Sequence, residues 1–261
     1  MFFELKNFFN AISNYKLWTE MANSKMRARF NRTILGPLWE ILGSLILLLL
    51  LAYLWSRLWG KEFIDFFTYI LVGYTLWRTI LSSVTDANSL FTQTYLGVLK
   101  NVQINFFGLA AASSYKNLVT LLLNLPLIVF VLYLNDQIYL SSLLFLISFL
   151  ILFFLSSTCA TFLLAVTCLK YRDLEHSIGV ILGMLFFFTP IIWSLEQLGD
   201  RAIFVKPNLL YHYLHFFRSG LQNGSVNLES IIVVVLCTIF LVLMSCYVHM
   251  KVKGKLAYWL D

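Results

Sequence analysis

The chain has 261 residues, of which 60% are hydrophobic and only 12% are charged. Polar side chains this sparse cannot cover the surface of a soluble globule, so the composition excludes a water-soluble domain and indicates an integral membrane protein. The formal net charge is +6, but no other feature of the sequence indicates nucleic-acid binding. We attribute this charge to membrane topology and to contact with anionic lipid headgroups.

Residues 1–35 predict an amphipathic helix at the membrane interface, followed by a basic junction. In helical register, polar residues such as Lys6 and Lys25 lie opposite an apolar face. That face consists of Leu5, Phe8, Phe9, Ile12, Tyr15, Ala22 and Met26. A helix of this kind lies in the plane of the bilayer surface. Two interpretations stay open: a lipid anchor, and a lever that contacts a cytoplasmic motor.

Residues 36–261 predict a single transmembrane domain. A hydrocarbon core about 30 Å thick needs about 20 apolar residues in a helix, and this region offers six such runs. The first starts at Gly36-Pro37, where proline suits the first helical turn. The six predicted spans are Pro37–Trp59, Phe63–Val84, Phe106–Leu134, Leu140–Leu169, Ile178–Leu195 and Leu228–Met250.

An even number of spans places both termini on one side of the membrane, and the distribution of Lys and Arg indicates which side. The termini and the loops on their side carry more of these residues than the opposite loops. They are Lys6, Lys16, Lys25, Arg27, Arg29, Arg32, Lys100, Lys170, Arg172, Lys251, Lys253 and Lys255. We therefore predict that both termini are cytoplasmic.

Three charged residues, Glu40, Arg78 and Lys116, fall inside predicted spans at least three residues from either end. A charge in lipid costs about 2.5 to 3.5 kcal/mol, which makes each of them a functional candidate. Glu40 lies one turn into its helix, and the stems of the two basic residues can reach a boundary, which favours snorkelling or structural pairing. No acid and base pair stands out as a proton relay, which weakens the case for a gradient-driven transporter.

The segment between the last two spans is longer than a link requires. Residues 197–206 are polar, whereas residues 207–218 are apolar and aromatic but too short to span. This pattern predicts short re-entrant or surface-lying helices on the outer side. His212 and His215 have no further ligand at suitable spacing, so no metal site is predicted.

Signatures of an active site are missing from the sequence. The four cysteines lie in or beside apolar runs without a CxxC pair and are expected to be free thiols. No GxxxxGK[ST] phosphate loop occurs, so the chain cannot by itself bind ATP in the P-loop manner.

Aromatic residues make up 17% of the chain. Most of the Tyr and Trp fit interfacial belts, and the question left open is whether some line a pathway on which a sugar chain slides.

Several motifs together resemble the transmembrane subunit of polysaccharide-exporting ABC transporters of the type-2 exporter class, and most closely the O-antigen and lipopolysaccharide exporter branch. The resemblance extends over nearly the whole chain. Its motifs are the basic string Arg27 to Arg32, Leu35-Gly-Pro-Leu-Trp39, Gly73-Tyr-Thr-Leu-Trp77, Tyr171-Arg-Asp-Leu174, Phe187-Phe-Thr-Pro-Ile-Ile-Trp193, Pro207, Tyr211-His212 and Arg218.

The resemblance implies a permease subunit that is not itself an enzyme and binds no cofactor. It implies a homodimer powered by two copies of a separate nucleotide-binding ATPase subunit, which holds ATP and Mg, in the bacterial inner membrane. The substrate would be an undecaprenyl-linked glycan, with O-antigen ahead of capsule or teichoic acid. The alternatives are a gradient-driven secondary transporter of a small molecule and a membrane-embedded glycolipid enzyme, although no HExxH motif, paired carboxylates or nucleophile constellation supports the latter.

The resemblance also implies roles for individual residues. The N-terminal helix and the loop from Asp86 to Asn105 would contact the ATPase, and residues 196–227 would form short outer-side helices near the exit. Candidates for ATPase contacts and a cytoplasmic gate are Arg27, Arg29, Arg32, Lys100, Arg172 and Asp173. Aromatic candidates for the channel and its exit are Trp39, Tyr74, Trp77, Trp193, Tyr211, Phe216 and Phe217. Candidates in the outer re-entrant segment are Pro207, His212 and Arg218.

Overall fold

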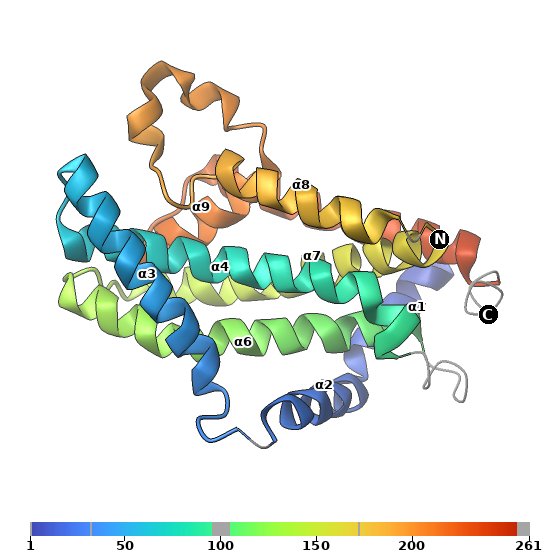
Figure 1. Ribbon diagram of the computed structural model, residues 1–261. Coiled ribbons are helices and arrows are strands. Elements are labelled where there is room, and N and C mark those ends of the chain that lie inside the picture. The colour runs from blue at the N-terminus through green and yellow to red at the C-terminus, as the bar shows by residue number, and fades with distance from the viewer. Residues whose placement is uncertain (1, 32, 96–104, 172, 255–261) are drawn as a thin grey trace.

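The structure is a computed structural model that describes residues 2–31, 33–95, 105–171 and 173–254. Every regular element in these ranges is helical (Figure 1), which confirms the prediction of an all-helical protein. In chain order the elements are α1 (Phe2–Ser13), α2 (Tyr15–Phe30), α3 (Leu38–Trp59), α4 (Phe63–Ser89), the π-helical turn η1 (Leu90–Thr94), α6 (Phe106–Leu134), α7 (Ser141–Lys170), α8 (Leu174–Phe188), the 3-10 helix η2 (Leu195–Phe204), α9 (Leu209–Gln222) and α10 (Leu228–Val252).

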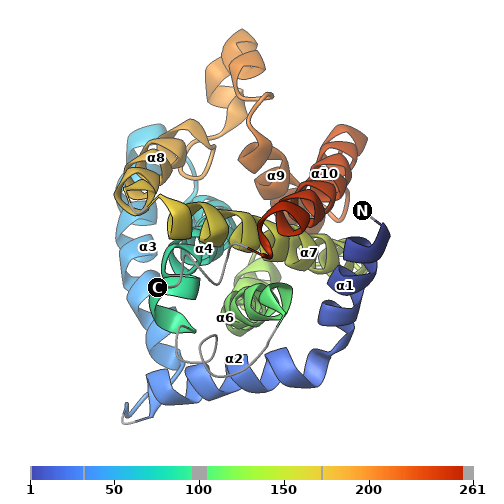
Figure 2. The ribbon, with the colours of Figure 1, turned by 90° about the vertical axis from the view of Figure 1, so that its right-hand side faces the viewer.

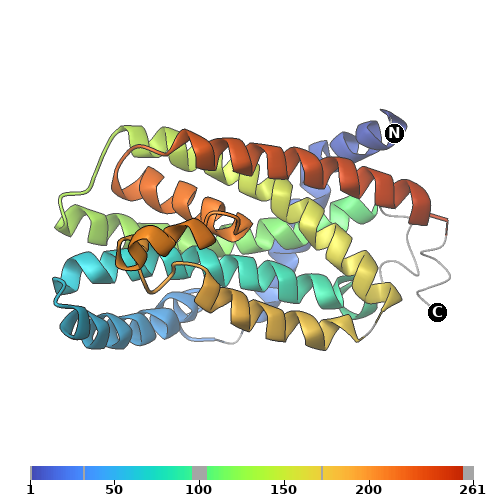
Figure 3. The same ribbon diagram turned by 90° about the horizontal axis from the view of Figure 1, so that it is seen from above.

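Four of these helices, α3, α6, α7 and α10, are long and apolar enough to cross a bilayer, as expected of an integral membrane protein. The 27 residues of α4 have sufficient length but include Asp65, Arg78 and Asp86. The 15 residues of α8 extend only about 22 Å at 1.5 Å per residue, less than a bilayer core. Helices α4, α6, α7 and α8 run along a similar direction, whereas α3 crosses them obliquely (Figures 1 and 3), and the count of six spans stays a prediction.

Helix α4 occupies the centre of the bundle. It contacts α3, α6, α7, α8 and α9, and the end-on view in Figure 2 shows it surrounded by its neighbours. Its buried side chains Ile70 and Leu76 join Phe149 of α7 and Val234 of α10 in the main hydrophobic core. A second core lies toward the N-terminal helices and includes Phe107, which is fully buried. Protein rather than lipid therefore surrounds much of α4, and this explains how the helix can carry polar residues.

The single N-terminal helix expected over residues 1–35 is instead two helices. The chain turns at Asn14, and the indole nitrogen of Trp18 donates a hydrogen bond across the turn to the carbonyl oxygen of Ile12 at 2.9 Å. After the turn, α2 packs across α6 (Figure 2). Phe8 is buried against the protein, whereas Phe9 is 59% exposed, so the predicted apolar face is only partly correct. Packing against the bundle selects a different set of side chains from the one that a continuous helix would present.

The fifth predicted span, Ile178–Leu195, is also shorter than expected, because α8 ends at Phe188. Proline disfavours a helical conformation in the residue before it. Thr189 precedes Pro190 and accordingly adopts an extended conformation with φ −100° and ψ 135°. Short helices do follow, since η2 and α9 occupy the segment before α10. Their predicted re-entrant placement on the outer side stays a prediction.

A buried acidic residue ties α1 to the end of α10. Glu4 is 2% exposed and its carboxylate lies 2.7 Å from Nδ1 of His249 and 2.7 Å from Nζ of Lys253. Burial alone would raise the pKa of this carboxyl. Hydrogen bonds from Lys253, His249 and Asn7 outweigh burial, and they hold the pKa at about 2, below the ordinary value of 4.5. The charged form of Glu4 therefore favours docking of α1.

The lowered pKa of Glu4 predicts acid-sensitive docking of α1. A depressed pKa in the docked state means that the stabilisation is complete above about pH 4.5 and is lost as the pH falls toward about 2. Hydrogen–deuterium exchange in lipid nanodiscs, corrected for intrinsic rates, should show protection of α1 declining over this range. Glu4→Gln should have weak protection at every pH, whereas Glu20→Gln, which alters an exposed carboxylate of α2, should behave like the unmodified chain. Unchanged protection in Glu4→Gln would contradict the assignment.

Candidate functional site

An ion triad joins α2, α3 and α4. The carboxylate of Glu40, in the first turn of α3, is 5% exposed and forms salt bridges with Arg29 of α2 and Arg78 of α4. Arg78 also donates to the backbone carbonyl oxygen of Glu40 at 2.7 Å. The position suits a carboxylate, because the N-terminal end of a helix carries partial positive charge. Two guanidinium groups on one buried carboxylate fix the end of α2 against the start of α3.

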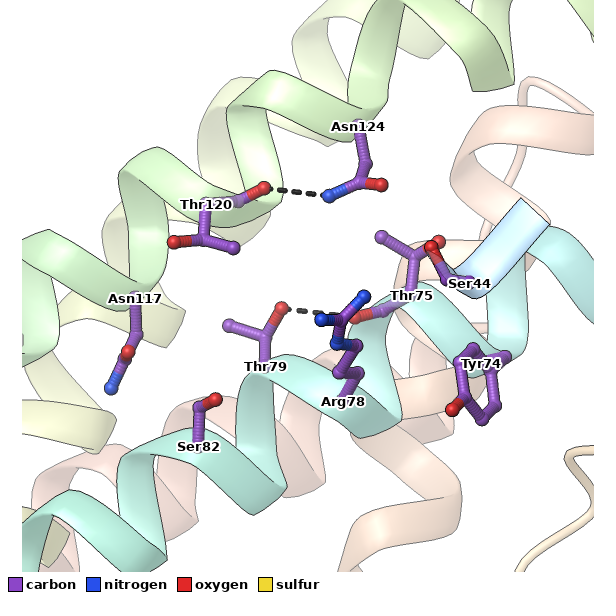
Figure 4. A pocket seen from close by; sticks show the side chains of 9 residues that line it. All are labelled: Ser44, Tyr74, Thr75, Arg78, Thr79, Ser82, Asn117, Thr120 and Asn124. Atoms are coloured by element: carbon purple, nitrogen blue, oxygen red, sulfur yellow. Dashed lines mark hydrogen bonds between the residues drawn. The ribbon is translucent and has the colours of Figure 1, made fainter. Parts of the chain in front are cut away.

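Beside this triad, a narrow polar crevice lies between α3, α4 and α6 (Figure 4). It is lined by Ser44, Tyr74, Thr75, Arg78, Thr79, Ser82, Asn117, Thr120 and Asn124. Several of the polar groups bond within their own helices: Thr79 donates to the carbonyl of Thr75 at 2.9 Å, and Asn124 to that of Thr120 at 2.8 Å (Figure 4). Such groups keep free acceptor capacity and can hold water or a hydroxylated ligand. Arg78 brings the only formal charge in the lining, which offers no pair of nucleophile and base.

A second charged cluster connects α4 to α6. Nζ of Lys116 lies 2.7 Å from Oδ2 of Asp86, and the side-chain amide of Asn117 donates to the same oxygen at 2.8 Å. Asn117 also donates to the hydroxyl of Ser83 at 3.2 Å. The structure therefore pairs Glu40, Arg78 and Lys116 with oppositely charged side chains, which favours structural pairing over snorkelling.

Helix α2 reaches this second cluster through Lys25. Its Nζ donates to the carbonyl oxygen of Thr94 at 3.1 Å and lies 3.5 Å from the ring centroid of Tyr95, both just after α4. Burial and the positive charge of Lys116 lower the pKa of Lys25 to about 8, although Asp86 opposes the shift. Helix α2 therefore contacts the bundle through two basic side chains, Lys25 and Arg29.

On the other end of the bundle, Arg218 of α9 clamps the turn that follows α8. Its guanidinium donates to the carbonyl oxygens of Pro190 at 2.8 Å and Ile191 at 3.2 Å, and it lies 3.6 Å from the ring centroid of Tyr69. The Tyr69 hydroxyl donates to the carbonyl oxygen of Trp193 at 2.9 Å. Because α8 ends at a proline, the carbonyls beyond it lack helical partners, and these side chains satisfy them.

The residues predicted to contact the ATPase or form a cytoplasmic gate lie in different environments. Arg29 belongs to the ion triad, whereas Arg27 and Asp173 are exposed and accessible to a partner. Arg32, Lys100 and Arg172 lie outside the described residues.

The aromatic candidates also divide into two groups. Trp39 is 56% exposed, and Tyr74, Trp193 and Tyr211 are partly buried. The other three rings pack inside the chain: Phe216 and Phe217 lie against Phe149 with ring centroids 5.5 and 5.0 Å away, and Trp77 lies 5.6 Å from Phe186. Trp77, Phe216 and Phe217 are thus buried among side chains of the same chain, and their place in a channel stays a prediction.

In the outer segment, Pro207 is exposed and His212 is buried. The two ring nitrogens of His212 lie within hydrogen-bond distance of the Ser230 hydroxyl at 3.2 Å and the Lys206 carbonyl at 2.8 Å. Both nitrogens are therefore engaged in holding α9 to its neighbours. Within the described ranges, no three His, Cys, Asp or Glu side chains gather as metal ligands would.

Sequence reasoning missed Asp86, Lys25, Tyr69 and Gly73 as members of these clusters. The available signal was the need of Lys116 for a counter-charge in a low-dielectric environment. Asp86 is an acidic residue near the end of the preceding helix and could have been proposed as that partner. The contacts of Tyr69 and Gly73 with Arg218 had no comparable signal in the sequence.

Comparisons with known proteins agree with the motif resemblance. No family model matches the chain. An O-antigen export system permease protein RfbA of Klebsiella pneumoniae is 20% identical over 93% of this chain and 94% of its own length, and a second protein of that name and organism is 20% identical over 97% and 98%. An RfbA of Myxococcus xanthus is 25% identical over 71% of each chain. The chain is thus a distant homologue of these permease proteins, which supports a transport subunit rather than an enzyme.

The Arg218 clamp predicts opposite effects for two glycine substitutions. A Cβ at Gly73 would lie 2.0 Å from Nη2 of Arg218, whereas a Cβ at Gly43 of α3 would meet nothing within 4 Å. Helical Gly→Ala changes normally stabilise by about 1 kcal/mol, but each buried donor left without a partner costs about 1 to 3 kcal/mol. Gly73→Ala should therefore lower the melting temperature of the purified protein by several degrees and Gly43→Ala should not. Equal melting temperatures for the two variants would contradict the clamp.

Proposed function

We propose that this chain is the transmembrane permease subunit of an ATP-driven exporter of lipid-linked polysaccharide, with O-antigen as the first candidate substrate. The observation that carries the proposal is similarity to O-antigen export permeases over up to 97% of the chain. The apolar helices and the motif combination support the same conclusion. The chain lies in the bacterial inner membrane with six spans and cytoplasmic termini.

In the proposed assembly, two copies of the chain associate with two copies of an ATPase subunit. The ATPase binds ATP and Mg. The exposed side chains Arg27 and Asp173 are available for that contact, and Arg32, Lys100 and Arg172 are retained as candidates from the sequence. The exported molecule carries a polyprenyl lipid, and capsule or teichoic acid precursors are the other glycans that fit.

Helix α2 acts as a lever in this proposal. A helix held to the membrane by lipid contacts alone would not need specific bonds to the bundle. Trp18 and Ala22 are buried against the protein, and Arg29 and Lys25 anchor the helix to α3 and to η1, which follows α4. Displacement of α2 by the ATPase would therefore reach α3 and α4 directly.

The channel candidates that keep accessible surface are Trp39, Tyr74, Trp193 and Tyr211. Aromatic faces bind sugar rings by apolar contact without fixing them through many hydrogen bonds, which suits a polymer that must slide. The hydroxyl and amide groups of the polar crevice beside Tyr74 lie within the same part of the bundle.

The deciding experiment combines purification with genetics. The chain is expressed together with its neighbouring genes, and a strain that lacks it is tested for surface polysaccharide. We expect a stable complex with an ATPase, loss of surface glycan and accumulation of lipid-linked polymer inside the cell. Transport by the purified chain without any ATPase would support the gradient-driven alternative and contradict the proposal.

The ion triad predicts a loss of coupling in Glu40→Gln. Removing one partner of a buried ion pair costs about 3 to 5 kcal/mol, and here it loosens α2 from α3 and α4. In proteoliposomes the variant complex should still hydrolyse ATP but export much less glycan per ATP. Glu62→Gln, which changes an exposed carboxylate before α4, is the matched control. If Glu40→Gln fails to accumulate, Arg29→Gln tests the same contact from its exposed side, and normal export by that variant contradicts the lever.

A further inference from the structure

A concave basic patch lies at the turn from α3 to α4, at the end of the bundle away from both termini (Figure 1). It offers about 970 Å³ of free space, part of it open to the outside. We call this patch the basic groove, and it shares no residue with the ion triad or the polar crevice. Its lining consists of Tyr53, Ser56, Arg57, Lys61, Glu62, Phe63 and Ile64.

The two cations of the basic groove keep their capacity to bind an anion. Arg57 and Lys61 are both exposed, and among the residues that the structure describes no carboxylate forms a salt bridge with either of them. The Arg57 guanidinium lies 6.0 Å from the ring centroid of Tyr53, and Nζ of Lys61 lies 3.5 Å from the Ser194 hydroxyl, so both contacts are weak and involve neutral groups. Two positive charges and the negative charge of Glu62 leave the lining with a net charge of +1.

The geometry of the helix end explains only part of this charge. The C-terminal end of α3 carries partial negative charge, which favours a cation such as Arg57 in its last turn. Lys61 lies beyond the helix. The turn there is closed by backbone bonds, because the N–H groups of Gly60 and Lys61 both donate to the carbonyl oxygen of Ser56. The side chain of Lys61 is therefore not needed to hold the turn.

An apolar stripe on α3 leads up to the basic groove. Leu50, Leu54 and Leu58 are spaced four residues apart and so lie on one face of the helix, where they are 59%, 56% and 71% exposed. Helix α3 is long and apolar enough to cross a bilayer. The end of such a helix lies where hydrocarbon meets the phosphate groups of the lipids. Unpaired cations at the depth of phosphates thus adjoin an exposed apolar face at the depth of acyl chains.

This combination of charge and stripe favours a phospholipid over other occupants. A free phosphate ion would bind the cations but leave the leucines uncovered. A second copy of the chain that packed through the same patch would bring like charges together at the interface. An anionic phospholipid satisfies both parts, because its phosphate accepts hydrogen bonds from the cations and its acyl chain covers the stripe.

We propose that the basic groove binds one anionic phospholipid, with its phosphate held by Arg57 and Lys61 and one acyl chain along Leu50, Leu54 and Leu58. A headgroup with one net negative charge, such as that of phosphatidylglycerol, neutralises the groove, whereas zwitterionic phosphatidylethanolamine leaves its net charge unchanged. The bound lipid would brace the turn from α3 to α4. The site does not depend on the exported molecule, so its failure and the failure of the proposed function are separate results.

Competitive lipid binding tests the site on the full chain. The purified protein is offered equal amounts of phosphatidylglycerol and phosphatidylethanolamine with the same acyl chains, and bound lipids are counted by native mass spectrometry. We expect preferential retention of phosphatidylglycerol. The Arg57→Gln/Lys61→Gln variant should bind it roughly 25-fold more weakly, since each basic residue near an anionic headgroup contributes roughly fivefold. Equal retention of the two lipids by the unmodified chain would overturn the proposal.

A matched variant separates the basic groove from general surface charge. Arg201→Gln/Lys206→Gln removes the same charge from two exposed basic residues that lie outside the lining. Its affinity for phosphatidylglycerol should equal that of the unmodified chain. A loss as large as that of Arg57→Gln/Lys61→Gln would mean that the lipid responds to net charge alone, and the site would be wrong.

Substitutions at Leu54 test the acyl chain and the other occupants. Leu54→Gln keeps both cations and should weaken phosphatidylglycerol binding. Unchanged binding in this variant, or displacement of the lipid by inorganic phosphate but not by chloride at equal ionic strength, would identify a site for phosphate alone. Leu54→Cys should stay uncrosslinked under oxidation in nanodiscs that contain phosphatidylglycerol. Disulfide-linked dimers through this cysteine would show that a second copy covers the stripe. Each of these results contradicts the proposal.

Discussion

The central constraint on this structure is that charged side chains of α4 must be neutralised where water is scarce. Arg78 and Asp86 lie on the same helix about two turns apart, and each finds its counter-charge on a different neighbour. Glu40 brings the start of α3 against α4, and Lys116 brings the first half of α6 against α4 about two turns further along. A buried charge without a partner is strongly destabilising, so these two pairs limit how α3 and α6 can be placed.

The same charged clusters also attach α2 to the bundle. Arg29 shares the carboxylate of Glu40 with Arg78, and Lys25 reaches the end of α4 beside the pair of Asp86 and Lys116. Helix α2 is consequently part of the folded subunit rather than an appendage on its surface. Under the proposed function, a helix bonded to α3 and to η1 is well placed to transmit work from an ATPase.

At the opposite end of the bundle, backbone carbonyls rather than charged side chains need partners. Pro190 stops α8 and leaves backbone carbonyls without helical donors. Arg218 supplies several donors from a single side chain and stacks on Tyr69, while Gly73 provides the space that the guanidinium occupies. A cation held by carbonyl dipoles and an aromatic face needs no carboxylate. The segment that carries η2 is thereby attached to α4 and α9.

Composition and apolar run length by themselves determined that this chain is a helical membrane protein, and they placed α3, α6, α7 and α10 within two residues of their observed ends. These properties are local, because hydrophobicity and a rise of 1.5 Å per residue suffice to define an apolar helix. The break at Asn14 and the burial of Phe216 and Phe217 were decided by packing against distant segments. Likewise, the sequence marked Glu40, Arg78 and Lys116 as charges inside spans, and the resemblance named Arg218 in the outer segment, but only the tertiary structure identified their partners. Ion pairs and carbonyl contacts between residues tens of positions apart depend on how helices cross, and no local pattern records that arrangement.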